Sequence, residues 1–225
     1  MKIAELFASI QGEGRLAGVP SLFIRTSGCN LRCAWCDTPY TSWHSEGEER
    51  TLDGIMEWVR GYPRFRHAVL TGGEPMIFPE IVSLSKELKQ AGLHVTIETA
   101  ATVFQAAACD LMSLSPKLAN STPEDPVWGP RHEQRRLQPE VLRRLTSEYD
   151  YQLKFVVQSP GDLAEIQAIQ ALCGASDEKI LLMPEGIDGP TLEQRSAWLV
   201  ELCKQHGYRF TPRLHILLYG QRRGV

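Results

Sequence analysis

Short apolar runs alternate with amphipathic stretches along this 225-residue chain, and that alternation constrains the fold more than any other feature. Strands are predicted at residues 21–25, 67–70, 94–98, 111–114, 152–157 and 180–183. Helices are predicted at 55–59 (after a cap at Thr51), 79–90, 139–149, 163–172 and 192–206, and strand-like runs at 209–219. A β–α unit repeated about six times implies a parallel sheet. Six units are too few for an eight-stranded barrel, so we expect an α/β fold, a partial (β/α)6 TIM-like barrel in one domain, 1–225.

Polar motifs follow four of these strands. They are a cysteine loop after the first, residues 72–74 after the second, Glu98 and Thr99 at the end of the third, and residues 115–117 after the fourth. Parallel α/β folds bind ligands at the carboxyl ends of their strands. The motifs therefore predict one active site at that edge.

Three cysteines, Cys29, Cys33 and Cys36, form a C-x3-C-x2-C pattern with no fourth cysteine nearby. Such closely spaced thiolates suit a soft metal or a cubane iron–sulfur cluster. A cluster that only transfers electrons normally has four cysteine ligands, so three leave one iron open to bind a small molecule. Zinc is the alternative, with His44 as the only nearby fourth ligand, but structural zinc usually takes two separated ligand pairs.

The remaining cysteines, Cys109, Cys173 and Cys203, lie in apolar stretches and are expected to be buried small hydrophobes. A disulfide framework does not suit a chain of this length without a signal peptide. Oxygen-sensitive thiolates and the lack of a targeting signal lead us to expect a cytoplasmic protein.

Charge and hydropathy each argue against one broad class of partner. With 24 basic and 27 acidic residues the net charge is −3, so bulk electrostatics do not favour nucleic acid. No apolar segment is long enough to span a bilayer, so no membrane partner is expected. One basic stretch, residues 131–144, is interpreted as a solvated helix face.

The cysteine spacing, with the aromatic Trp35 just before the last cysteine, resembles the signature of radical S-adenosylmethionine (SAM) enzymes. In that family three cysteines hold a 4Fe-4S cluster, and the open iron chelates the amino and carboxylate groups of SAM. Electron transfer then cleaves the sulfonium to a 5′-deoxyadenosyl radical. The resemblance implies a barrel of the radical SAM type and these SAM-binding residues: Trp35, Asp37, Gly73, Glu74, Ser115, Pro116 and Lys117.

A sharper resemblance covers essentially the whole chain. Residues 9–14, 25–31, 36–40, 71–75 and 219–225 look like those of the 7-carboxy-7-deazaguanine synthase family. This resemblance implies a lyase of queuosine biosynthesis that converts 6-carboxy-5,6,7,8-tetrahydropterin to 7-carboxy-7-deazaguanine with loss of ammonia. SAM serves there as a reusable cofactor.

The same resemblance assigns roles to residues. Ile10, Gln11, Gly12, Arg25 and Thr71 would contact the pterin. Thr38 would be a ligand of Mg²⁺, and Glu98 is the candidate for steering the ring contraction. Ala100 and Ala101 stand where the family commonly has Asn-Gly, so any side-chain contact expected at position 100 is lost.

The resemblance also implies a reductant protein, such as a flavodoxin, and a homodimer. A radical SAM activase that installs a glycyl radical on a partner enzyme is the first alternative, because activases share the cysteine spacing and compact size. The second is a non-catalytic iron–sulfur or zinc module, which would have four protein ligands and no SAM.

Overall fold

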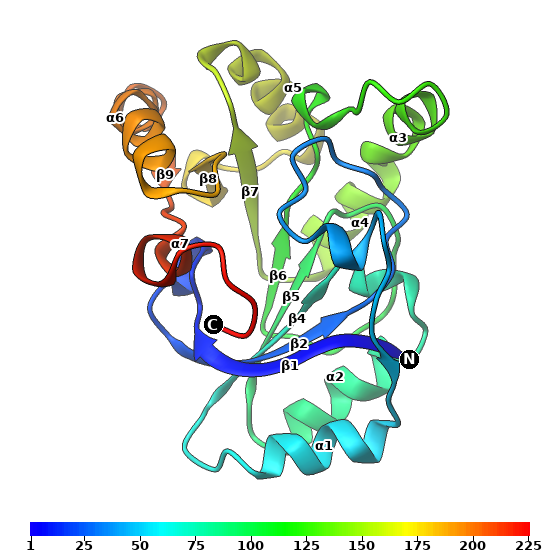
Figure 1. Cartoon of the computed structure of the whole chain (residues 1–225). Helices are drawn as coiled ribbons and strands as arrows, with labels where there is room; N and C mark the ends of the chain where they lie inside the picture. Colours follow the sequence, from blue (N-terminus) through cyan, green and yellow to red (C-terminus); the bar gives the residue numbers. More distant parts are fainter.

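A single nine-stranded sheet runs through the chain in the order β3-β1-β2-β4-β5-β6-β7-β8-β9 (Figure 1). The computed structural model describes all residues from 1 to 225. The strands are β1 (Lys2–Ile10), β2 (Pro20–Thr26), β3 (Glu48–Glu49), β4 (His67–Gly72), β5 (His94–Thr99), β6 (Leu111–Leu114), β7 (Tyr151–Val157), β8 (Ile180–Pro184) and β9 (Arg209–Phe210). The helices are α1 (Leu52–Arg60), α2 (Ile81–Gln90), α3 (Trp128–Arg136), α4 (Pro139–Glu148), α5 (Leu163–Cys173), α6 (Gly189–His206) and α7 (Leu214–Tyr219).

The six predicted strands are β2, β4, β5, β6, β7 and β8, and each pairs in parallel with the next. The sheet does not close, because β3 lies at one edge and the two-residue β9 at the other. The expected partial barrel is therefore confirmed. Strict alternation fails once, since residues 100–110 between β5 and β6 form no helix.

Local signals explain where the first helix begins. Thr51 is extended, and its hydroxyl accepts a hydrogen bond from the Gly54 amide at 3.2 Å, as an N-cap should. Ile55, Met56 and Val59 then recur on one face and are buried. The spacing that predicted this helix is the spacing of its buried side chains.

Both ends of the chain differ from expectation. No strand was predicted at 2–10, where β1 pairs antiparallel with β2. The prediction of strands over 209–219 is wrong beyond Phe210, because α7 follows. This helix is a nearly continuous apolar run, which periodicity alone cannot separate from a strand, and it leaves Leu217 53% and Leu218 58% exposed. Residues 119–130, for which no helix was predicted, include the first turn of α3.

Strand periodicity gives the sheet two different faces. Side chains at alternate positions, such as Leu22, Ile24, Leu70 and Ile97, belong to one large buried core. The intervening positions carry mostly polar groups, including Arg25 in β2, Thr71 in β4, Glu98 in β5 and Lys154 in β7, and all four line one cavity. The second face therefore lines a cavity instead of packing against helices. No helix combines the length and apolar character needed to cross a membrane.

Candidate active site

A cavity of about 440 Å³ lies over the carboxyl ends of the strands. The cysteine loop and the C-terminal residues 221–225 contribute to its lining. The C-terminal residues are the red end of the chain in Figure 1. Predicted site residues that line it are Ile10, Gln11, Gly12, Arg25, Cys29, Cys33, Trp35, Cys36, Asp37, Thr38, Thr71, Gly73, Glu98, Ser115 and Lys117. Residues from five separate motifs thus meet in one place.

The three loop cysteines carry free thiols that line this cavity. The Leu31 amide donates a hydrogen bond to Cys29 Sγ at 3.3 Å, and Ser42 Oγ lies 3.3 Å from Cys36 Sγ. Burial raises the pKa of both Cys29 and Cys33 to about 12, so binding iron must displace their protons. Polar donors beside the sulfurs suit a cluster held by thiolates, and the three thiols fit a 4Fe-4S cluster with one open iron.

The four-ligand zinc alternative lacks its fourth ligand. His44 is exposed and does not line the cavity. No group of three or more His, Cys, Asp and Glu side chains converges as the ligands of one ion must. A cubane does not need such convergence, because each thiolate binds a different iron.

Tryptophan side chains and close backbone contacts hold the cysteine loop in place. Trp35 Nε1 donates to the Asn120 carbonyl at 3.1 Å, and Trp43 Nε1 donates to the Cys33 carbonyl at 3.1 Å. Gly73 packs so closely that an added Cβ would lie 2.3 Å from the Gly28 carbonyl oxygen. The backbone around the cysteine loop therefore leaves room only for glycine at position 73.

Two predicted SAM-binding residues, Glu74 and Pro116, do not line the cavity. Glu74 is fully buried, and its carboxylate accepts hydrogen bonds from Thr99 Oγ1 at 2.7 Å, from the Ala100 amide at 2.8 Å and from the Met76 amide at 3.0 Å. Burial raises the pKa of Glu74, although the three hydrogen bonds act to lower it. The side chain ties two strand-end loops together, and its contact with SAM stays a prediction. Ala100, the departure from the family pattern, takes part through its backbone amide.

Ser115 and Lys117 lie together at the end of β6. Lys117 Nζ donates to Ser115 Oγ at 2.8 Å and lies 5.9 Å from the centre of the Trp35 ring. A hydroxyl, an ammonium group and an indole therefore face one part of the cavity, next to the cysteines. This set can bind a ligand that carries a carboxylate and a flat ring.

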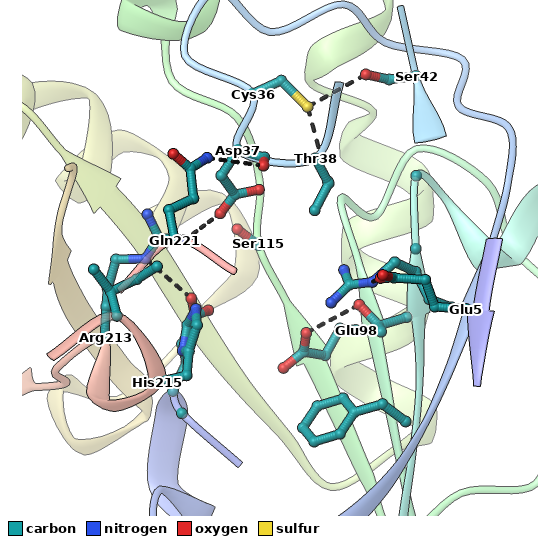
Figure 2. Close-up of a pocket in the computed structure, with 18 of the residues that line it drawn as sticks. Glu5, Cys36, Asp37, Thr38, Ser42, Glu98, Ser115, Arg213, His215 and Gln221 are labelled. Carbon is teal, nitrogen blue, oxygen red and sulfur yellow. Dashed lines mark hydrogen bonds and ion pairs between the residues drawn. The ribbon is translucent and has the colours of Figure 1, made fainter. Parts of the chain in front are cut away.

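Glu98 lies on another wall. Its carboxylate accepts hydrogen bonds from Gln11 Nε2 at 3.1 Å and Thr71 Oγ1 at 3.2 Å, so three predicted site residues are linked. Nearby, Arg25 Nε lies 2.9 Å from Glu5 Oε2, and its guanidinium lies 5.4 Å from the Phe7 ring centre. Figure 2 shows Glu5 and Glu98 on one side of the cavity, and Arg213 and His215 on the other.

A buried ionic network was missed by the sequence analysis. Lys154 pairs with Glu13 and lies 3.7 Å from Glu98. Arg213 pairs with Asp37 and lies 3.2 Å from Glu13. Burial alone would raise the pKa of Glu13, but Lys154 and Arg213 hold it well below its usual range. Arg213 likewise holds the pKa of Asp37 below its usual value, although burial alone would raise it. The predicted contact of Asp37 with a cofactor would therefore compete with this ion pair.

The network joins the C-terminal segment to the rest of the site. The Leu214 amide donates to the Gly12 carbonyl at 2.9 Å, and Gln221 Nε2 donates to the Asp37 carbonyl at 3.3 Å. At Gly12 a Cβ would lie 2.0 Å from Nδ1 of His215, so only glycine leaves room for that ring. One signal was available in the sequence: Lys154 is a lone charge in a strand that otherwise reads as buried.

Comparison with known proteins agrees with the geometry. Residues 23–126 match the family model of the Radical SAM superfamily. The 7-carboxy-7-deazaguanine synthase of Halobacterium salinarum is 44% identical over 97% of this chain and 90% of its own length. The enzyme of the same name from Rhodopirellula baltica is 45% identical over 99% of this chain and 88% of its own. The crystal structure of QueE from Escherichia coli, 25% identical, superposes with a TM-score of 0.71 over 95% of this chain and 94% of that one.

The open parallel barrel and its three-cysteine loop define a radical SAM enzyme, which uses a 4Fe-4S cluster and SAM. Similarity along nearly the full chain then identifies the family within this class of enzymes. The chain belongs to the 7-carboxy-7-deazaguanine synthase family. These relatives support the synthase interpretation and not the glycyl-radical activase alternative.

Proposed function

We propose that the cavity converts 6-carboxy-5,6,7,8-tetrahydropterin to 7-carboxy-7-deazaguanine with loss of ammonia, as a radical SAM carbon–nitrogen lyase. The observation that carries this proposal is that motifs similar to the family's along the whole chain line one cavity. All 225 residues would act as one domain, since the sheet contains strands from Lys2 to Phe210.

Cys29, Cys33 and Cys36 would hold the cluster. Gly73, Ser115, Lys117 and Trp35 would hold SAM beside it. When bound, the cluster and SAM supply a carbon-centred radical that can abstract a hydrogen atom from the substrate. The protein's part is to exclude water and fix the substrate next to them, which the tail at 221–225 supports by covering the cavity.

The substrate would lie between Arg25 and Glu98. Glu5 engages only Nε of Arg25, so the terminal nitrogens are free to pair with the substrate carboxylate. Glu98, held by Gln11 and Thr71, presents acceptor oxygens to ring N–H groups of the pterin. The stacked rings of Phe7 and Phe23, 4.8 Å apart, give the cavity an apolar floor for a flat ligand. Burial lowers the pKa of His215, so at neutral pH this ring is an uncharged hydrogen-bonding group.

Thr38 would be the only protein ligand of Mg²⁺. Its hydroxyl lines the cavity, whereas the neighbouring carboxylate of Asp37 is paired with Arg213. Magnesium prefers six oxygen ligands and usually keeps several waters, so one hydroxyl, the substrate carboxylate and water suit it.

Thr38→Ala should lower turnover roughly 10-fold or more and weaken stimulation by Mg²⁺, because a metal ligand is lost. Cluster content and SAM binding should survive, because the Thr38 hydroxyl makes only long contacts, 3.9 Å to Cys36 Sγ and 3.4 Å to Thr41 Oγ1. The 2.9 Å bond from Thr41 goes to the Thr38 backbone carbonyl and is kept in the variant. Turnover titrated with Mg²⁺, with Thr38→Ser as the matched control that keeps the hydroxyl, tests this role. An unchanged magnesium response in Thr38→Ala would refute it.

SAM should act as a reusable cofactor. In anaerobic multiple-turnover reactions its concentration should stay nearly constant while product accumulates, and liquid chromatography can follow both. Methionine formed in a 1:1 ratio with product would contradict this proposal and favour the SAM-consuming chemistry of an activase.

The proposed function also implies an electron donor, an oligomeric state and a cellular compartment. The cluster needs a one-electron reductant, and a flavodoxin suits that need. A homodimer is consistent with the exposed apolar side chains of α7, which include Leu217 and Leu218. A reducing compartment such as the cytoplasm would keep the free thiols available for iron.

A further inference from the structure

The basic stretch at 131–144 contains two buried side chains that the sequence analysis did not anticipate. On α4, Arg143 and Arg144 pair with glutamates, as a solvated helix face should. On α3, however, His132 is only 1% exposed and Arg136 only 8%. The interpretation as a solvated face is therefore wrong for these two positions. They are four residues apart, so they lie on the same face of α3.

Both ring nitrogens of His132 are hydrogen-bonded. The Arg32 amide donates to Nδ1 at 3.1 Å, so Nδ1 carries no proton. Ser121 Oγ lies 2.9 Å from Nε2, and because this hydroxyl donates to the Leu118 carbonyl at 2.6 Å, it accepts from the Nε2–H group. Burial and the neighbouring charge of Arg136 lower the pKa of His132 to about 4, so the ring is neutral at neutral pH. The ring is therefore a fixed acceptor for one backbone amide.

The amide bound by His132 belongs to the cysteine loop, the long loop after β2 that lies beside α3 in Figure 1. Arg32 directly precedes Cys33, an expected cluster ligand. Directly after Cys33, the Ala34 amide donates to the Ser121 carbonyl at 2.9 Å. The amides on both sides of Cys33 are therefore anchored, one by His132 and the other by the residue that holds the His132 ring.

Arg136 anchors the loop at the end of β6 in a similar way. Its Nη1 donates to the Lys117 carbonyl at 3.0 Å, and Glu133 and Glu165 each pair with the guanidinium at 2.5 Å. Lys117 is one of the residues proposed above to hold SAM. Helix α3 thus contacts the backbone of the cysteine loop through His132 and the backbone of the SAM-binding loop through Arg136.

We propose that His132 is a positioning residue that fixes Cys33 relative to the SAM-binding side chains of Ser115 and Lys117. Its ring acts through the Arg32 amide and does not line the cavity. An iron that chelates SAM needs its thiolates and the SAM-binding groups at one separation, because a misplacement of about 1 Å can cost about 100-fold in rate. This inference rests on the proposed SAM-binding residues and is independent of the pterin reaction.

Two replacements in the reconstituted full-length enzyme separate the loop contact from the packing of the ring. His132→Asn places an amide oxygen where Nδ1 lies and can still accept from the Arg32 amide. His132→Gln places its terminal amide where Nε2 lies, next to Ser121, and offers no acceptor at the Nδ1 position. Both should hold as much iron and sulfide as the unmodified protein, because all three loop thiols remain.

Release of 5′-deoxyadenosine with dithionite and SAM should slow about 10-fold or more in His132→Gln and stay within about twofold in His132→Asn. Electron paramagnetic resonance of the reduced cluster, titrated with SAM, gives a second readout that needs no turnover. His132→Gln should need about 10-fold more SAM to change the signal, whereas His132→Asn should follow the unmodified protein.

His67→Gln is the matched control. His67 is also buried and bonded at both nitrogens, with Nδ1 2.7 Å from Ser21 Oγ and Nε2 2.8 Å from Thr96 Oγ1. It lies at the start of β4, away from the strand ends that form the site, and does not line the cavity. His67→Gln should lower the melting temperature and leave both SAM cleavage and the SAM titration unchanged.

Four results would overturn the proposal: equal losses in His132→Asn and His132→Gln, unchanged SAM cleavage in His132→Gln, a loss that His67→Gln shares, or a loss of iron that parallels the loss of cleavage. If His132→Gln does not fold, His132→Leu, which also lacks an acceptor, takes its place with the same expected results. These measurements contain no pterin. A protein that passes them but forms no 7-carboxy-7-deazaguanine would contradict the proposed function alone.

Discussion

Replacing Cys29, Cys33 or Cys36 with alanine should abolish SAM cleavage. Each thiolate is expected to hold a different iron of one cluster, so a single loss disables it. The loss should exceed the roughly 10–100-fold that removal of an outer-layer partner of a metal ligand costs. Iron and sulfide content after reconstitution, together with anaerobic release of 5′-deoxyadenosine, measures the effect.

The other three cysteines provide the control. Cys203 is buried, and Cys109 and Cys173 pack against the core away from the cavity. Serine at any of these positions should leave iron content and SAM cleavage intact. If one of them proved necessary for iron binding, the cluster would have been assigned to the wrong cysteines.

Replacing Lys154 with methionine should destabilise the fold by about 3–5 kcal/mol, because a buried carboxylate is left without its partner. The Lys154 side chain is 5% exposed and contacts both Glu13 and Glu98. Activity should fall as well, since Glu98 loses the neighbouring positive charge. Denaturant unfolding at neutral pH measures the change in the free energy of unfolding.

The pH dependence of the Lys154→Met effect shows whether the lost charge pairing causes the destabilisation. Because the pKa of Glu13 is held below its usual value of 4.5, its ionisation contributes stability above that pH, and this contribution is lost as pH falls through the lowered pKa. The difference in the free energy of unfolding between the original protein and Lys154→Met should therefore become smaller in acid. The double variant Glu13→Gln/Lys154→Met should recover part of the loss. A gap that stays constant with pH would point to altered packing instead.

Much of the fold could be predicted because strands and helices carry their periodicity locally. The run at 67–70 is apolar because β4 is buried, and Thr51 marks a helix start through its own hydroxyl. Helix α7 was missed because its run of leucines fits either period, and its place depends on a distant contact, that of Leu214 with Gly12. Strand β1 was missed as well, at the antiparallel edge of the sheet.

The site was predictable where a motif is contiguous, as in the cysteine loop. The site was not predictable where its residues are distant in the sequence and meet only in the folded structure. Arg213 and Asp37 lie far apart in the sequence, and only the fold shows that they pair. Glu74 could be singled out from its motif, but only the fold shows that its carboxylate accepts hydrogen bonds from the Met76 and Ala100 amides.

The most direct test of the proposed reaction is anaerobic incubation of the reconstituted protein with dithionite, SAM, Mg²⁺ and 6-carboxy-5,6,7,8-tetrahydropterin, followed by mass spectrometry. The reaction should yield 7-carboxy-7-deazaguanine in amounts that exceed the enzyme, with equal ammonia. A protein that holds its cluster and cleaves SAM but leaves the pterin unchanged would contradict it.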